Sequence, residues 1–433
     1  KDNMVVEMYY DINREPNWRW IPRNIRYDKT EKLRQKNNTS FGNDYNTALN
    51  VWKTYYQPIT PEMLFNKSII EINQEDDYYI TSNLSRSKSK SINLRNFHNQ
   101  FVKNEVLISP SCKLFKDAFV LDLGCGQGGD LNKFEYGKIS KYLGINKFLN
   151  DLIAPETGAI KRYQKLVEDI PNIYQAYFIN GDIGKNIKNG EFLLDNKQFN
   201  FKEMHQILFN KKHNSSLKIK DNISGIFENG FDIINIQFVI HYLFKDNISL
   251  NNLIDNIDEN LKVGGLLIGT CYDGQTVFNT LKDKSIGDSL LGYDDNNSLV
   301  WRIKKQYEQS SFPDNSDSLG YPIDVITESI GTENREYLVN FKFLTKLLEA
   351  KNIKLLTKEQ CIEMNLQFGN EDTSSGLFED LYYQNLNNKA KHYLKDYEKE
   401  ISFLNRWFIF QKQPEKLGSM KIKVKRSPRT KKL

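Results

Sequence analysis

Three glycines lie at a spacing that suits a ligand-binding turn. Gly124, Gly126 and Gly128 follow the apolar run 120–123 and precede a helix-like stretch, 131–134. Because glycine adopts positive φ and carries no Cβ, such a turn lets the backbone approach a ligand beyond the end of a strand. Dinucleotide-binding loops and purely structural turns share this pattern, so the glycines by themselves leave the ligand open.

Acidic and amide side chains at neighbouring strand ends narrow the choice of ligand. Asp122 lies two residues before Gly124. A carboxylate there favours S-adenosylmethionine, which carries a sulfonium and an ammonium, over a dinucleotide, whose pyrophosphate gains nothing from an acid. After the next two apolar runs come Asn146, whose amide can hydrogen-bond ribose hydroxyls less strongly than a carboxylate, and Asp182, which can accept from an adenine amino group.

A fourth strand end carries three polar side chains. Gln237, His241 and Tyr242 stand at the end of the apolar run 231–238. Such residues are poorly suited to a core and well suited to a cleft. A lone histidine is often a core residue, but a His-Tyr pair beside the glycine loop favours a functional role.

Apolar runs of strand length alternate with helical stretches and must position these residues. The expected strands are 118–125, 142–145, 177–179, 231–238, 266–271, 353–357 and 406–411, and a helix is expected over 94–109. This alternation predicts an α/β fold, with a mostly parallel sheet covered by helices on both faces. Two polar insertions, about 184–230 and 283–333, are interpreted as long functional or mobile loops.

The charge of the chain is concentrated in its last residues. The 433 residues include 60 basic and 55 acidic ones, a formal net charge of +5. Residues 416–433 hold six lysines, two arginines and no acid, so 52 basic residues remain without them, for a net charge of −3. We expect this tail to be disordered and to add salt-dependent attraction for RNA.

Several classes of protein are excluded or disfavoured by composition. No apolar run reaches the length of a membrane span. The four cysteines, Cys112, Cys125, Cys271 and Cys361, form no CxxC pair, so we expect neither a metal site nor a disulfide framework, and a reducing compartment is favoured. The first residues lack the features of a signal peptide and are interpreted as the interior of a longer chain.

Five segments in order resemble the mRNA cap guanine-N7 methyltransferase family. They are residues 94–103, 121–131, 237–242, 264–270 and 335–339, of which the Gln-Phe-x-x-His-Tyr segment at 237–242 is the most diagnostic. The resemblance covers about residues 94–413. It implies a class I S-adenosylmethionine-dependent methyltransferase fold with a seven-stranded sheet.

The resemblance implies two groups of site residues. The cofactor would contact Lys103, Asp122, Gly124, Gly126, Asn146, Asp182, Gln237 and Tyr242. The cap would contact Asn99, Gln100, Lys133, Arg162, His241 and Glu336, with His241, Tyr242 and Glu336 as catalytic residues. The chain departs from the family at Asn146, where an acid is usual, and at Gln127, where a basic residue is usual. A family aromatic near the base falls at Asn405, with Trp407 close by.

The N-terminal region has a second resemblance. Residues 18–29 and 43–48 are similar to the end of the oligonucleotide-binding fold of RNA guanylyltransferases, whereas the Lys-x-Asp-Gly nucleophile motif is absent. The implied organisation is a guanylyltransferase remnant (1–66), a linker (67–93), a methyltransferase domain (94–413) and a basic tail (414–433). It is similar to that of multifunctional capping enzymes of large DNA viruses.

The predicted function is methyl transfer to N7 of the guanosine cap of viral mRNA. The implied partners are capped RNA, triphosphatase and guanylyltransferase domains of the same chain, and a stimulatory subunit. The implied location is the host cytoplasm, with packaging in the virion as a further option. Two alternatives stay open: a methyltransferase for another substrate, and a cap- or RNA-binding or allosteric module without turnover.

Overall fold

The computed structural model describes residues 4–11, 14, 19–34, 90–194, 199–211, 223–328, 331–384 and 393–414. The chain divides into two units, residues 1–74 and 75–433, which are described separately. Several expectations lie outside the described residues: the motif 43–48, most of the linker and almost all of the basic tail. The same holds for a helix that the sequence predicts over 45–56, before Pro58.

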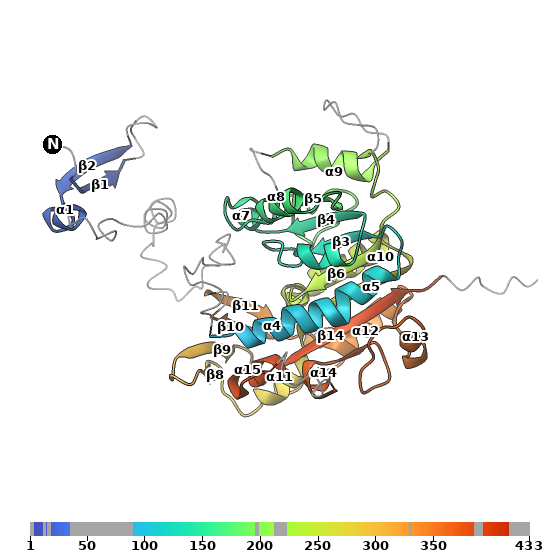
Figure 1. Cartoon of the computed structure of the whole chain (residues 1–433). Coiled ribbons are helices and arrows are strands. Elements are labelled where there is room, and N and C mark those ends of the chain that lie inside the picture. The colour runs from blue at the N-terminus through green and yellow to red at the C-terminus, as the bar shows by residue number, and fades with distance from the viewer. Residues whose placement is uncertain are drawn as a thin grey trace, which may run out of the picture. The chain divides into compact units, whose positions relative to one another are not determined.

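The central sheet of the larger unit has the strand order β12-β14-β7-β6-β3-β4-β5, with β13 paired to β14 at its side (Figure 1). Strands β3 to β7 pair in parallel, and β14 runs antiparallel to β7, β12 and β13. The bounds are β3 Phe119–Leu123, β4 Lys141–Asn146, β5 Gln175–Asn180, β6 Phe231–Gln237, β7 Leu261–Tyr272, β12 Ile353–Leu355, β13 Ser375–Leu377 and β14 Asn405–Lys412. The α/β class and all seven predicted strands are confirmed, and β13 is an addition.

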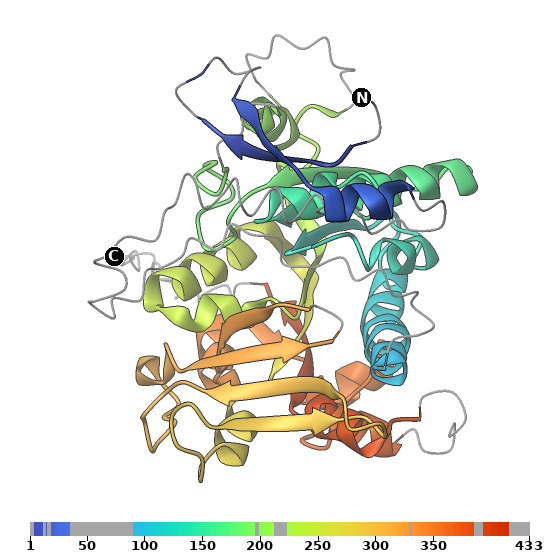
Figure 2. The same ribbon diagram turned by 90° about the vertical axis from the view of Figure 1, so that its left-hand side faces the viewer.

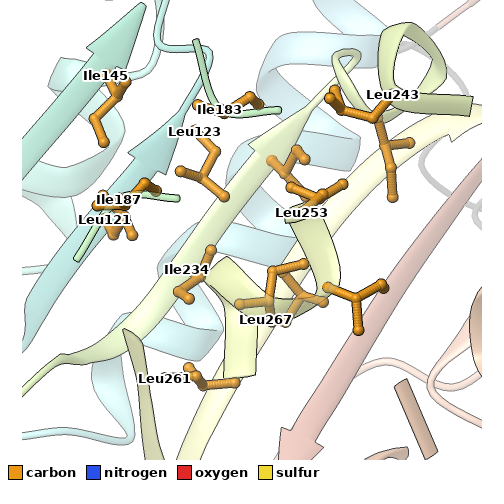
Figure 3. Close-up of a cluster of buried hydrophobic side chains, with 14 of the residues drawn as sticks. Leu121, Leu123, Ile145, Ile183, Ile187, Ile234, Leu243, Leu253, Leu261 and Leu267 are labelled. Carbon is orange, nitrogen blue, oxygen red and sulfur yellow. The ribbon is translucent and has the colours of Figure 1, made fainter. Parts of the chain in front are cut away.

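Helices bury apolar stripes against both faces of this sheet. One face packs against α9 Phe201–Phe209, α10 Asn247–Asn260 and α12 Phe341–Glu349. Figure 3 shows part of this cluster, with Leu121 of β3, Ile234 of β6 and Leu253 of α10. The other face packs against η3 Phe97–Ile108, α6 Leu131–Tyr136, α8 Ala159–Asp169 and α14 Phe378–Gln384. Because strand side chains alternate, Leu121 and Leu123 enter the first cluster and Val120 the second.

The predicted helix over 94–109 is confirmed and extends further in both directions. It consists of α4 Ile92–Asn96, η3, which has π-helical hydrogen bonding, and α5 Ser109–Lys113. The remaining helices are α7 Leu149–Ile153, η5 Ile240–Lys245, α11 Gly274–Thr280, η6 Ser316–Ser318, α13 Lys358–Glu363 and α15 Asp396–Ser402. Within the described part of the chain, no helix combines the length and apolarity needed to cross a membrane.

The interpretation of residues 283–333 as a loop is wrong, because they contribute to a second sheet. Four antiparallel strands follow in the order β11-β10-β9-β8 (Figure 2). Their bounds are β8 Ser289–Tyr293, β9 Leu299–Lys305, β10 Pro322–Thr327 and β11 Glu333–Tyr337. Buried Val300, Ile303 and Ile323 join Phe278 of α11 in a third core. The polar composition came from the turns and the outer face, which concealed the apolar positions.

The described part of the N-terminal unit is small. Alternating apolar and polar residues over 4–9 and 18–26 predict two strands there. They are confirmed as β1 Val6–Tyr10 and β2 Trp20–Ile25, which pair antiparallel with a bulge at Glu7/Met8. Helix α1 Tyr27–Arg34 follows. Arg26 donates two hydrogen bonds to Asp28, of 3.1 and 3.0 Å.

Candidate functional site

The glycine loop lies where the sequence predicts, directly after β3. Gly124, Gly126 and Gly128 have φ of +79°, +51° and +71°. A Cβ on Gly124 would lie 2.5 Å from a methyl carbon of Val239, which leaves no room for a side chain there. The close approach brings the loop against the segment that follows β6 and leads into His241.

A buried polar network links side chains of β4, β3, β6 and β7, with Asp122 and Gln237 near the carboxyl ends of β3 and β6. The strand-end network consists of Tyr142, Asp122, Asn235, Gln237 and Thr270. Asp122 accepts from the Tyr142 hydroxyl at 2.7 Å and from the Asn235 amide at 2.8 Å. Gln237 donates to Asn235 at 2.8 Å and accepts from Thr270 at 2.9 Å. Burial, reinforced by the charge of Asp130, raises the pKa of Asp122 to about 6 despite these hydrogen bonds. Both Asp122 oxygens and both Gln237 polar atoms thus have protein partners.

Two of the predicted lysines are held together by a buried carboxylate. The Asp130 carboxylate forms ion pairs with the Nζ atoms of Lys103, at 3.0 Å, and of Lys133, at 2.6 Å. Burial raises the pKa of Asp130, but the two ammonium groups outweigh it and hold that pKa well below its usual range. Lys133 also donates to the Gly129 carbonyl at 2.9 Å and is 6% exposed. The predicted cap contact of Lys133 therefore needs correction, because this buried side chain binds Asp130 and the Gly129 carbonyl of the loop.

The two departures from the family pattern are hydrogen-bonded to a common acid. Asn146 accepts from the Gly126 N–H at 3.1 Å and donates to Asp151 at 3.2 Å. Gln127 donates to Asp151 at 3.4 Å and accepts from Arg162 at 3.2 Å. Arg162 and Asn146, assigned to cap and cofactor from sequence, are thereby joined through one hydrogen-bonded chain.

Asp182 follows β5 at the same edge of the sheet. Its carboxylate accepts from the Gly184 N–H at 2.9 Å and pairs with Lys147 at 3.1 Å. Burial opposes ionisation, but Lys147 and the Gly184 N–H prevail and lower the pKa of Asp182. The group is ionised at neutral pH and keeps 24% of its side chain exposed, as a hydrogen-bond acceptor for a ligand requires.

His241 and Glu336 meet from two different sheets. His241 lies in η5, after β6 of the central sheet, and Glu336 lies in β11 of the second sheet. The His241 Nε2 and Glu336 Oε2 atoms are 3.5 Å apart, and the side chains are 2% and 5% exposed. Tyr242 donates to the other Glu336 oxygen at 3.5 Å. The second sheet therefore completes a site that the central sheet alone lacks.

Polar atoms of the His241–Glu336 pair have no hydrogen-bond partner among the described residues. Both ring nitrogens of His241 and the Oε2 atom of Glu336 are buried and unsatisfied. Burial lowers the pKa of His241 to about 3 and raises that of Glu336 to about 8. At neutral pH both groups are thus mostly uncharged, and the pair is not a salt bridge. Buried polar groups without partners are costly, which favours a ligand that supplies the missing partners.

The other predicted cap residues lie in varied surroundings. Asn99 is partly buried and Gln100 exposed, both on η3. Trp407 is 0% exposed in the core, and Asn405 is 2% exposed and donates to the Ile401 and Ser402 carbonyls. Neither of these two can present a face to a base, so the position of the family aromatic is not filled by them.

Several residues of the site were missed from sequence. Asn235, Asp130 and Asp151 hold predicted residues in place, and Tyr272 lies with its ring centroid 6.2 Å from that of His241. Phe238 has φ of +56°, a strained value for a bulky residue. The signal for Asn235 was available: it lies two residues before Gln237 on the same strand face. The others depend on tertiary contacts.

Comparisons with known proteins show the family of the chain. The family model of the mRNA (guanine-N(7))-methyltransferase domain matches residues 73–413. A probable mRNA-capping enzyme of Acanthamoeba polyphaga mimivirus is 32% identical over 95% of this chain, which spans 36% of that protein. An mRNA cap guanine-N(7) methyltransferase of Debaryomyces hansenii is 28% identical over 47% of this chain and 36% of its own length. An mRNA-capping enzyme of African swine fever virus (strain Badajoz 1971 Vero-adapted) is 24% identical over 85% of this chain and 37% of its own.

The family model covers well over half of the chain and includes the glycine loop, Gln237, His241 and Glu336. The chain spans about a third of each of these three relatives. It belongs to the mRNA (guanine-N(7))-methyltransferase domain family.

Proposed function

We propose that this chain transfers a methyl group from S-adenosylmethionine to N7 of the guanosine cap of mRNA. The observation that carries the proposal is the unsatisfied His241–Glu336 pair beside the glycine loop. Guanine offers two adjacent donors, N1–H and the exocyclic amine, which suit a carboxylate, and acceptors that suit a neutral imidazole N–H.

S-adenosylmethionine fits the residues at the loop better than a dinucleotide does. Lys103 and Lys133 share the single carboxylate of Asp130, so this cluster has a net charge of +1, which suits the one carboxylate of S-adenosylmethionine better than the two negative charges of a pyrophosphate. Asp182, which follows β5 at the same edge of the sheet, provides a partly exposed, ionised hydrogen-bond acceptor. We propose that the cofactor is held by Lys103, Asp122, Gly124, Gly126, Asn146, Asp182, Gln237 and Tyr242, with Asp122 and Gln237 acting through the strand-end network. When bound, the cofactor supplies an electrophilic methyl group on its sulfonium.

The chain's own residues would act by positioning rather than by removing a proton. Guanine N7 already carries a free lone pair, so no general base is needed. Glu336 would hold the far edge of the base through N1–H and the amine, which fixes the direction in which N7 points. Once ionised, it would also stabilise the positive charge that develops on the imidazole ring of the base. His241 and Tyr242 would restrain the purine and exclude water, as Asn99, Gln100 and Arg162 would restrain the rest of the cap.

Methylation of cap dinucleotides tests this proposal. The purified chain is incubated with methyl-labelled S-adenosylmethionine and GpppA, and digestion of the product identifies the labelled atom. We expect label at guanine N7, and no labelled product with ApppA, which lacks guanine. Label at any other atom, or no transfer despite measurable cofactor binding, would contradict the assignment.

We extend the proposal to the wider organisation of the protein. The support is the resemblance of residues 18–29 to guanylyltransferases, together with the two viral relatives named as mRNA-capping enzymes, of which the chain spans about a third. The proposed organisation is a guanylyltransferase remnant (1–66), a linker (67–93), the methyltransferase domain (94–413) and a basic tail (414–433). The proposed partners are capped RNA, triphosphatase and guanylyltransferase domains, and a stimulatory subunit. The proposed site of action is the host cytoplasm, with packaging in the virion.

A further inference from the structure

We infer that Asp151 is a positioning residue of the cofactor site, and that Asn146 and Gln127 are a matched pair of amides that this acid requires. The inference rests on the proposed function for the identity of the cofactor. It concerns five residues linked in order by hydrogen bonds, here called the amide relay: Arg162, Gln127, Asp151, Asn146 and Gly126.

The burial of the acid sets the first requirement. Asp151 is 3% exposed and lies in the first turn of α7, five residues after Asn146. A buried carboxylate needs hydrogen-bond donors on its oxygens. One oxygen accepts from the Gln127 amide and the other from the Asn146 amide.

The amide of Asn146 is used at both of its polar atoms. Its nitrogen donates to Asp151 and to the Phe148 carbonyl at 3.0 Å, and its oxygen accepts from the Gly126 N–H. An aspartate at position 146 has no donor when ionised, so it would leave the Phe148 carbonyl without this bond. It would also face Asp151 as a like charge at short range. The acid that the family pattern places at 146 is therefore incompatible with Asp151.

Gln127 is matched to its neighbours in the same way. A basic side chain there would pair with Asp151 but could not also accept from Arg162, because lysine and arginine have no acceptor. Glutamine does both through its two amide atoms. The charged groups of the relay are Arg162 at one end and Asp151 at its centre. The amides of Gln127 and Asn146 connect these groups by hydrogen bonds to the glycine loop.

The relay helps to fix the backbone of the glycine loop at the proposed cofactor site. The N–H groups of Gly124 and Cys125 donate to the Ile145 carbonyl at 2.8 and 3.1 Å, and the Gly126 N–H donates to Asn146. Only the last of these three bonds depends on a side chain, whose orientation Asp151 sets. Loss of Asp151 should therefore release the Asn146 side chain. The hydrogen bond that helps to hold Gly126 at its φ of +51° would then be lost.

A double-mutant cycle on the full chain tests the inference. The variants are D151N, N146D and N146D/D151N, and the readout is the affinity for S-adenosylhomocysteine measured by calorimetry. We expect each single variant to weaken binding at least tenfold. The double variant should recover most of this loss, because one carboxylate again faces one amide. D169N, which removes an exposed acid at the end of α8, should bind like the unmodified chain.

Thermal unfolding and cap binding separate positioning from general destabilisation. We expect D151N to lose less affinity for the cap dinucleotide than for S-adenosylhomocysteine, because Arg162 is the one proposed cap residue that belongs to the relay, and to keep a folded, cooperative melt. Additive losses in the double variant, tighter binding by N146D, or equal losses for cofactor and cap would overturn the inference. Because cofactor affinity is measured without turnover, failure to methylate a cap would contradict the proposed function and leave this cycle interpretable.

Discussion

Two groups of buried polar side chains lie near the carboxyl end of β6 but differ in how their hydrogen-bonding atoms are satisfied. In the strand-end network, both carboxylate oxygens of Asp122 and both amide atoms of Gln237 have protein partners. In the His241–Glu336 pair, three buried polar atoms have no such partner among the described residues. A satisfied network specifies a rigid scaffold, whereas an unsatisfied pair sacrifices stability for a ligand. The difference indicates that the strand-end network supports the site, whereas the His241–Glu336 pair binds the ligand.

Removal of Glu336 should give the largest effect on the reaction. We expect E336A to reduce cap methylation by about 10²–10³-fold, because the carboxylate both orients the base and stabilises the developing charge. Radiolabel transfer to GpppA measures this loss. Since an unpaired buried polar group destabilises the free protein, the melting temperature should stay level or rise.

The matched control lies on the same strand. E333Q changes an exposed residue of β11 that pairs with Arg302, and an exposed ion pair contributes only about 0–1 kcal/mol. Its methylation rate should equal that of the unmodified chain. If E336A methylates at the normal rate, the pair is no cap site.

Removal of Asp122 should act on stability instead. D122A leaves the Tyr142 hydroxyl and the Asn235 amide without their acceptor, so we expect a loss of about 2–3 kcal/mol in the free energy of unfolding. Urea denaturation measures it, with D169N as an exposed control. An unchanged unfolding free energy would mean that the network does not support the fold.

Much of this contrast follows from sequence, because strand ends are recognisable. The seven predicted strands are apolar runs, and the parallel pairing of β3 to β7 brings the carboxyl ends of these five strands to one edge of the sheet. Gln237 and His241 can therefore be assigned to the site from the order of the residues alone. Glu336 was found through the family resemblance, since no local rule links residues 94 positions apart, as Tyr242 and Glu336 are.

The missed features depend on contacts between distant segments or on burial. Lys133 looks like a surface cation in sequence, but Asp130 draws it beneath the loop. Trp407 looks available as a cap aromatic, but β14 is covered on both faces, so this side chain lies in the core. The second sheet was hidden because its buried positions alternate with charged ones, as in β9. Burial, unlike strand propensity, is decided by the partner surface.

The pH dependence of cap binding should distinguish the two groups further. The pKa of Glu336 is raised to about 8, so its carboxylate is mostly protonated at pH 7 in the free protein. Because guanine N1–H and the amine require an ionised acceptor, cap affinity should rise about fivefold between pH 7 and pH 8. Titration calorimetry of GpppA over this range measures the change.

The same shift has an opposite effect on the fold. Between the ordinary pKa of 4.5 and about 8 the folded state binds more protons at Glu336 than the unfolded state does. The contribution of this group to stability therefore decreases as pH rises through that window.

The control for the cap measurement is E336Q, in which the rise in cap affinity between pH 7 and pH 8 should disappear. If E336Q retains the full rise, a different group controls it.

The smallest expected effect is at the far end of the strand-end network. Thr270 donates from its hydroxyl to Gln237 at 2.9 Å and is 0% exposed. Valine has the same shape without the donor, so T270V should cost about 0.5–1.5 kcal/mol in the free energy of unfolding. T280V, on the exposed face of α11, should cost less than about 0.5 kcal/mol. Cap affinity should be unchanged in both variants, because Thr270 contributes to the scaffold and not to the pair. A loss of cap affinity in T270V larger than its loss of stability would show that the network and the pair act as one unit.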